Sequence, residues 1–137
     1  MTVKLADAKK IIEAAQKKAK DIDTLMDIAV VDAGGNLVAF ERMDGAWIGS
    51  IDIAINKAYT ARAFDMATQD LKQISGPEKD NICFGIHTTN DCRIVIFGGG
   101  VPLTKDGEIV GAIGVSGGYA EAQDHPVAEA GAAVYNT

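Results

Sequence analysis

Two clusters of small residues are the first candidates for chemistry in this chain. They border two apolar runs that an Asp106-Gly107 turn separates, and they consist of Gly98, Gly99 and Gly100 on one side and Ser116, Gly117 and Gly118 on the other. Apolar runs joined by an Asp-Gly turn are typical of a β-hairpin. Glycines at strand ends allow a ligand to approach the backbone closely, and free backbone N–H groups favour anions. The pattern indicates a site without naming a reaction.

Two basic residues are candidates to bind a carboxylate beside these glycines. Lys57 lies on a helix face that otherwise consists of Ile and Ala, where a lysine can simply extend its head to water. The functional interpretation is that Lys57 and Arg42 together receive an anion. Trp47 lines the same mouth or a subunit contact. Asp44, which precedes Gly45, suits a turn better than an acid catalyst, and it completes the candidate ligand-binding set.

Three other motifs that could carry chemistry are not supported by the rest of the sequence. The segment Gly114–Gly118 fits the G-x-S-x-G nucleophile elbow, and Asp124 and His125 follow it. That elbow works in a mostly parallel sheet with its partners on separate loops, so a tight exit from the strand is the favoured interpretation of Ser116. No Gly-Lys-Ser/Thr follows Gly100, and no G-x-G-x-x-G occurs, which excludes the phosphate and dinucleotide loops.

The sulfur and imidazole ligands do not form a zinc pattern. Cys83, His87 and Cys92 have the spacing Cys-x3-His-x4-Cys, which matches no common zinc site, and a fourth ligand would have to come from His125. Free thiols are the expectation for both cysteines in an unexported chain.

Length and charge narrow the classes of partner. The chain has 137 residues and a net charge of −6, so we expect a single domain over residues 1–137. An acidic chain argues against nucleic acid and anionic membranes as partners. No apolar run approaches the ~20 residues of a membrane helix. The segment Met1–Lys4 has no apolar signal core, so we expect the cytoplasm.

Hydrophobic periodicity predicts alternating helices and strands. Apolar residues from Leu5 to Ile22 recur at helical spacing, Ser50 can cap a second helix, Thr68 a short one through Ile74, and Asp124 opens a last one. Strands are predicted over residues 25–31, 37–40, 82–86, 93–97 and 109–115. The expected fold is α/β (α+β), with helices packed on a mostly antiparallel sheet of about five strands.

Several segments together resemble the GlcG/HbpS family, which includes the C-terminal domain of PduO-type proteins. These segments span residues 31–46, 50–61, 98–103, 111–117 and 123–131, with sequences such as Arg42-Met43-Asp44-Gly45-Ala46 and Gly111-Ala112-Ile113-Gly114-Val115-Ser116-Gly117. The resemblance covers nearly the whole chain. It implies a three-layer α/β/α domain with a profilin-like layout and a homo-oligomer, either a tetramer or an octamer. The alanine-rich tail and the first helix are expected to supply close-packed faces for that assembly.

The resemblance also implies haem as the one candidate cofactor. Some relatives bind haem, with ligands from the first helix and first strand, and others accompany enzymes of glycolate or diol use. In this chain residues 5–22 and 25–31 contain no His or Cys, so the candidate iron ligands are His87, His125, Cys83 and Cys92. His87 is preferred because it lies in a polar loop. The adenosyltransferase domain that precedes this module in PduO is not in this sequence, so corrinoid chemistry is not implied.

The sequence therefore predicts a small-ligand-binding domain of the GlcG/HbpS type, with haem as a candidate ligand, accessory to small organic acid or diol metabolism. The first alternative is an enzyme acting on a small carboxylate or carbonyl compound, with Lys57, Arg42, Asp44 or Ser116 near the chemistry. The second is a structural accessory protein without a ligand. The polar groups are too generic to name the ligand.

Overall fold

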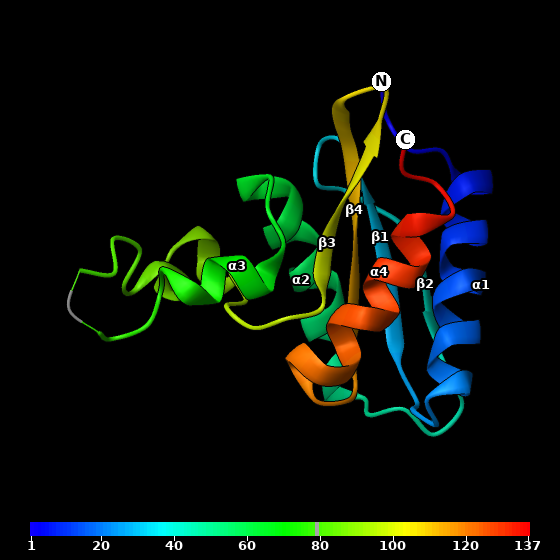
Figure 1. The fold of residues 1–137 in the computed structure, drawn as a ribbon, viewed down its shortest axis with the longest axis horizontal. Helices are drawn as coiled ribbons and strands as arrows, with labels where there is room; N and C mark the ends of the chain where they lie inside the picture. Colours follow the sequence, from blue (N-terminus) through cyan, green and yellow to red (C-terminus); the bar gives the residue numbers. More distant parts are fainter. Residues whose placement is uncertain (79) are drawn as a thin grey trace.

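A four-stranded antiparallel sheet forms the middle layer of the molecule (Figure 1). This computed structural model describes residues 1–78 and 80–137. The strands are β1 (Asp27–Asp32), β2 (Leu37–Arg42), β3 (Gly100–Lys105) and β4 (Glu108–Ser116), in the order β2-β1-β4-β3. The predicted antiparallel α/β fold is confirmed, with four strands in the described residues rather than about five. The predicted hairpin at Asp106-Gly107 joins β3 to β4.

Helices cover both faces of this sheet, which gives three layers (Figure 1). On one face lie α1 (Leu5–Asp21) and α4 (His125–Ala133), and their apolar residues pack on Ile28, Val30 and Ile113. On the other face lies α2 (Gly49–Phe64), where Ala54, Ala58 and Ala61 pack on Ala29, Val31 and Ala112. The alternation along β1 therefore divides one strand between two apolar clusters.

The segment between α2 and β3 projects from the body of the molecule (Figure 1). It contains the short helix α3 (Thr68–Gln73) and the 3₁₀ helices η1 (Ile86–Thr88) and η2 (Asn90–Cys92). The strands predicted over residues 82–86 and 93–97 are wrong. Ile86 N–H bonds to the nearby Cys83 carbonyl, and Val95 N–H bonds to the Thr60 hydroxyl on α2, so neither segment offers its backbone to the sheet.

Both predicted caps are also wrong, for a common reason. The residue before α2 is Ile48 and the residue before α3 is Ala67, and neither makes a side-chain cap. Ser50 is buried inside the first turn of α2, and the Thr68 hydroxyl accepts a hydrogen bond from Gly100 N–H at 2.9 Å. Burial against the sheet therefore overrides the local capping preference.

A five-residue π-helix, η3 (Ala120–Asp124), leads directly into α4, which has proline in its first turn as expected. None of the helices among the described residues is long and apolar enough to cross a bilayer.

Gly114 sets the distance between α2 and the sheet. A Cβ atom at this position would collide with the carbonyl oxygen of Ala54 and the backbone nitrogen of Ala58. Gly114→Ala should therefore lower the free energy of unfolding by about 3 kcal/mol, because helix backbone must move away from the strand. Denaturant unfolding measures the loss.

Gly49→Ala is the matched control for this prediction. No heavy atom lies within 4 Å of a Cβ at Gly49, so alanine there should leave the stability unchanged or raise it by up to about 1 kcal/mol. Equal stability of the two variants would contradict the close approach at Gly114.

Candidate functional site

The structure brings the two predicted clusters to the same end of the sheet. Gly100 begins β3 directly after Gly99, Ser116 ends β4, and the Val115 N–H donates to the Gly99 carbonyl at 2.8 Å. Gly98, Gly99, Gly100 and Ser116 are buried, whereas Gly117 and Gly118 are half-buried. The clusters are therefore neighbours, but only the second one faces outward.

Lys57 fills the space behind these clusters. Its side chain is 0% exposed, and its Nζ donates to Asp124 Oδ2 and to the Val115 carbonyl, both at 2.9 Å. The Phe97 ring lies over the ammonium at 4.9 Å from the ring centroid. The other carboxylate oxygen of Asp124 accepts from Gly118 N–H at 2.8 Å. One ion pair thus connects α2, β4 and η3.

The side chain of Lys57 is thus enclosed beside the two clusters, so a ligand in this structure does not reach it. Burial lowers the pKa of the Lys57 ammonium, and the charge and hydrogen bond of Asp124 oppose that shift. Because the ammonium already has an anion and a carbonyl as partners, its geometry is that of an internal counter-ion.

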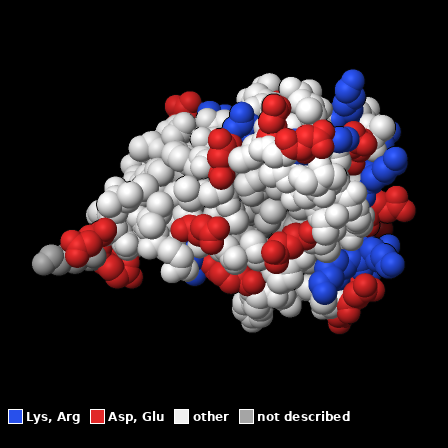
Figure 2. Space-filling view, turned by 45° about the horizontal axis from the view of Figure 1, so that its top comes forward, with Lys and Arg blue, Asp and Glu red and all other residues white. Residues whose placement is uncertain are grey.

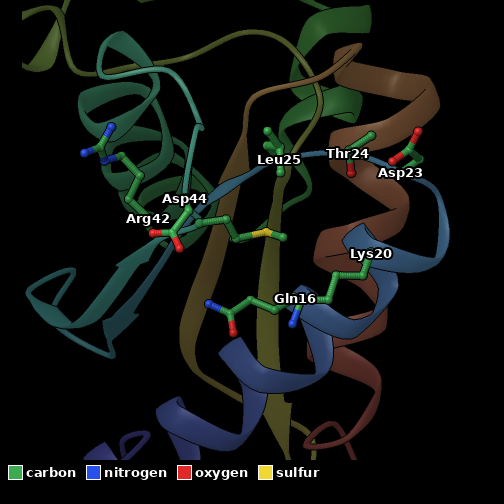
Figure 3. Close-up of a pocket in the computed structure, with 8 residues that line it drawn as sticks. Gln16, Lys20, Asp23, Thr24, Leu25, Arg42 and Asp44 are labelled. Atoms are coloured by element: carbon green, nitrogen blue, oxygen red, sulfur yellow. The ribbon is translucent and has the colours of Figure 1, made fainter.

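Open space lies around the loop from Asp23 to Leu25, where two pockets meet. The first has a volume of about 470 Å³ and is lined by Gln16 and Lys20 of α1, by that loop, and by Arg42, Met43 and Asp44. Figure 3 shows Arg42 and Asp44 on one side of this pocket and Lys20, Thr24 and Asp23 on the other. Charges of both signs therefore surround an opening that also contains Leu25 and Met43.

The second pocket lies on the other side of the same loop and has a volume of about 300 Å³. It is lined by Gly45, Ala46 and Trp47 from the segment before α2, and by Gly117, Gly118 and Gln123. Trp47 is 70% exposed. The two pockets thus collect five of the predicted binding residues, namely Arg42, Asp44, Trp47, Gly117 and Gly118.

Gly117 has a backbone that only glycine adopts without strain. Its φ is +144°, and a Cβ would collide with the Leu25 carbonyl oxygen. A valine at this position would therefore test folding rather than ligand binding. Side chains such as Trp47 and Arg42 are the better probes of the pockets.

A buried carboxyl that the sequence reasoning missed lies beside this region. Asp27 begins β1 and is 0% exposed, and neither of its oxygens has a hydrogen-bond partner among the described residues. Its direct cross-strand neighbours are Arg42 on β2 and Ser116 on β4. Burial raises the pKa of the Asp27 carboxyl, and the charge of Arg42 opposes that shift.

The candidate iron ligands do not line either of these two pockets. His87 is exposed on η1 in the projecting segment. His125 is buried in the first turn of α4, with its Nε2 at 3.2 Å from Glu129 Oε1. Cys83 and Cys92 are free thiols. No group of three or more His, Cys, Asp or Glu side chains within residues 1–78 and 80–137 is placed to hold a metal ion.

Some pocket residues had a weak signal in the sequence and others had none. Asp27 is an acidic residue at the start of an otherwise apolar strand, which is unusual for a buried position. Gln16 and Lys20 are one helical turn apart on the polar side of α1, but nothing in the sequence indicates that this side borders the loop after β2.

The Lys57–Asp124 pair should dominate the stability of this end of the molecule. Lys57→Met should lower the free energy of unfolding by about 3–5 kcal/mol, because it leaves a buried carboxylate without its cation. Adding Asp124→Asn should recover part of that loss, since the unpaired charge is removed. Urea unfolding of the single and double variants measures both effects.

The exposed pair Lys72–Glu121, with side chains 50% and 40% exposed, is the control for Lys57. Lys72→Met should cost less than about 1 kcal/mol. A loss at Lys57 that is no larger than the loss at Lys72 would contradict the role of the buried pair.

Asp27 should make stability depend on pH in a defined direction. Its pKa in the unfolded chain is near 3.8, and burial raises the folded-state value. As pH rises above 3.8, the folded state keeps its proton longer, so the free energy of unfolding falls until Asp27 ionises in the folded protein. Asp27→Asn should therefore be more stable than the wild type at pH 7, by on the order of 1 kcal/mol.

Unfolding curves at several pH values test this, with exposed Asp44→Asn as the control. An advantage of Asp27→Asn that does not shrink toward acid pH would contradict the prediction.

Comparison with known proteins agrees with this fold. The chain matches the family described as haem degrading protein HbpS-like over residues 3–133. It is 44% identical over 128 residues to a 15.0 kDa protein in the dhaT-dhaS intergenic region of Citrobacter freundii, covering 93% of this chain and 88% of the relative.

Two solved structures are similar throughout. Protein ORFY of Klebsiella pneumoniae has a TM-score of 0.92 at 38% identity, covering 97% of this chain and 90% of the other. A PduOC:heme complex has a TM-score of 0.91 at 31% identity, covering 99% and 96%. Haem is thus a candidate cofactor in this fold. With the family match extending over nearly every element described above, the chain belongs to the HbpS-like family.

Proposed function

We propose that this chain is a small-ligand-binding domain whose ligand occupies the two pockets around the loop from Asp23 to Leu25. The observation that carries the proposal is the convergence of five residues, predicted from the sequence, on these pockets. The first pocket combines the apolar side chains of Leu25 and Met43 with several polar ones, and a concave opening with convergent polar groups is the usual form of a small-molecule site.

The first pocket offers two cations to the carboxylate of an acidic ligand. The chain is acidic overall, yet α1 carries Lys9, Lys10, Lys17, Lys18 and Lys20. Figure 2 shows most of the visible basic side chains toward one end of the molecule, interspersed with acidic ones, whereas the tapering opposite end carries acidic ones. Lys20 and Arg42 bring two cations to the first pocket, and Asp23 and Asp44 bring two carboxylates that can accept hydrogen bonds from a hydroxyl group of the same ligand. A small organic acid is the ligand class that fits, which agrees with an accessory role in organic acid or diol metabolism.

Trp47 reports on binding because it is the single tryptophan of the chain. A panel of small hydroxy and keto acids should include at least one that quenches its fluorescence to saturation. Arg42→Gln should weaken that binding about tenfold, because one charge-assisted hydrogen bond is lost.

Arg93→Gln is the matched control for this titration. The Arg93 guanidinium stacks on Tyr59 at 3.8 Å from the ring centroid and lines neither pocket, so binding should be unchanged. No saturable quenching by any acid, together with no mass retained in native mass spectrometry, would refute the proposed function. Turnover of the bound acid would favour the enzyme alternative.

Haem is the second candidate ligand, and the PduOC:heme complex favours it. The donor set of this chain fits haem at the projecting segment, where the His87 imidazole is exposed. Phe84 and Ile82 nearby are 66% and 86% exposed, which offers an apolar surface for a porphyrin. His125 fits less well because Glu129 holds it. Bound haem would supply redox or gas-binding chemistry, and the His87 imidazole would hold its iron.

Haemin titration followed at the Soret band tests this ligand. The wild type should show a saturable shift that His87→Ala abolishes, while His125→Ala retains it. Equal shifts in the wild type and His87→Ala would show that His87 is not the ligand. Absence of a saturable shift in all three proteins would exclude haem.

Self-association is part of the proposal. The tail and first helix pack on each other, since Gly131 lies against Ile11 and Ala15, so they do not supply free faces. Exposed apolar side chains occur instead at Ile82, Phe84, Trp47, Ile48 and Tyr119. Such side chains mark contact surfaces when they gather in patches.

Light scattering should give a mass several times 14.4 kDa, and a monomer at micromolar concentration would contradict a homo-oligomer.

A further inference from the structure

Asp27 has a carboxyl group that the fold buries without a hydrogen-bond partner among the described residues. Its side chain is fully buried, and both oxygens lack hydrogen-bond partners among the residues that the structure describes. An ionised carboxylate in such a place is costly, whereas the protonated acid costs less. The conformation seen here is therefore the one that suits a protonated Asp27.

The neighbours of Asp27 include one cation, Arg42, whose guanidinium bonds to a carbonyl group rather than to a carboxylate. Asp27 lies on the α2 side of the sheet, with Arg42 directly opposite on β2 and Ser116 opposite on β4. On α2, Ala54 packs against Gly114, and Ser50 lies one turn earlier on the same buried face. The group that α2 presents near Asp27 is therefore the neutral hydroxyl of Ser50. Lys57, also on α2, is already paired with Asp124. Arg42 is the cation that can respond to charge on Asp27.

Arg42 at present holds another part of the site. Its Nη1 donates to the carbonyl of Ala46 at 3.1 Å, and Figure 3 shows the guanidinium pointing away from Lys20. Ala46 belongs to the segment Met43–Trp47, which we call the shared wall because its residues line both pockets. Directly opposed residues in an antiparallel pair have Cβ atoms about 5 Å apart, so the same guanidinium is within reach of Asp27.

We propose that Asp27 is a positioning residue for Arg42 and that the two form a proton-controlled switch of the shared wall. With Asp27 protonated, Arg42 bonds to the Ala46 carbonyl and the wall has the position seen here. With Asp27 ionised, Arg42 turns to the Asp27 carboxylate, and the wall loses that anchor. An anionic ligand that binds Arg42 competes with ionised Asp27, so its binding is accompanied by proton uptake.

The switch has two consequences that can be tested separately, and the first can be tested without a ligand. Movement of the shared wall is a property of the protein alone. Coupling to an acid rests on the proposed function of the pockets. A test in ligand-free protein therefore distinguishes a failed switch from a failed ligand assignment.

Nuclear magnetic resonance of the ligand-free protein provides that test. The indole N–H of Trp47 gives one resonance, because the chain has one tryptophan, and this residue lies in the shared wall. The Asp27 carboxyl carbon and the Trp47 indole should titrate together, with a midpoint above that of exposed aspartates because burial raises the pKa of Asp27. In Asp27→Asn the indole should stop titrating and keep its low-pH position.

Arg42→Gln separates the proton from the movement. Asp27 should still titrate in this variant, at a higher pH because a favourable charge is lost, but the Trp47 indole should no longer follow it. Asp23→Asn and Asp44→Asn, which remove the two carboxylates that line the first pocket, should retain the coupled transition. Circular dichroism confirms that each variant is folded.

Two results would overturn the switch. One is an indole transition that persists in folded Asp27→Asn. The other is an indole that stays fixed in the wild type while the Asp27 carboxyl titrates. Loss of acid binding with an intact coupled transition would refute the proposed ligand and leave the switch standing.

Discussion

A single buried ion pair organises the end of the molecule on which the pockets depend. Lys57 extends from α2 past the end of β4 to Asp124, and Asp124 in turn accepts a hydrogen bond from the N–H of Gly118. Because each partner is enclosed, neither can turn to solvent without leaving the other as an unpaired charge. The pair therefore fixes the exit of β4 and the start of η3 relative to α2. Gly117, Gly118 and Gln123 line the second pocket as a consequence of this constraint.

Small residues make that constraint geometrically feasible. Ala54 and Ala58 approach β4 so closely that only Gly114 fits opposite them. The close contact brings the Lys57 backbone over Gly100, and the Lys57 side chain then reaches beneath Gly99. The glycines that look like a ligand cradle in the sequence thus accommodate a side chain of the same protein. Close packing and internal charge pairing are two parts of one arrangement.

Local patterns predicted the parts of the fold that local physics decides. The periodicity of α1, the Asp106-Gly107 hairpin and the apolar strands β1 and β4 all follow from residue spacing. The sequence could not reveal that Thr60 on α2 would capture the backbone at Val95, which removes residues 93–97 from the sheet. It also could not reveal the partner of Lys57, since Asp124 is 67 residues away. Arg42 was identified as a cation that could receive a carboxylate and Trp47 as an aromatic residue at the same mouth, whereas Lys20 enters the pocket only through helix placement.

The two acidic groups at this end of the sheet show why pairing matters more than burial alone. Asp124 and Asp27 are similarly enclosed, at 2% and 0% exposure. Asp124 has an ammonium and a backbone N–H, so its charge is compensated and its position is fixed. Asp27 has neither, and its nearest cation is engaged with the Ala46 carbonyl. One carboxyl therefore acts as a fixed anchor, while the other leaves an unsatisfied demand for a cation beside the pocket wall. Lys57 and Asp124 compensate each other's charge, whereas Asp27 lies opposite a cation that bonds to a carbonyl, so the adjustable interaction that we propose lies next to the pockets.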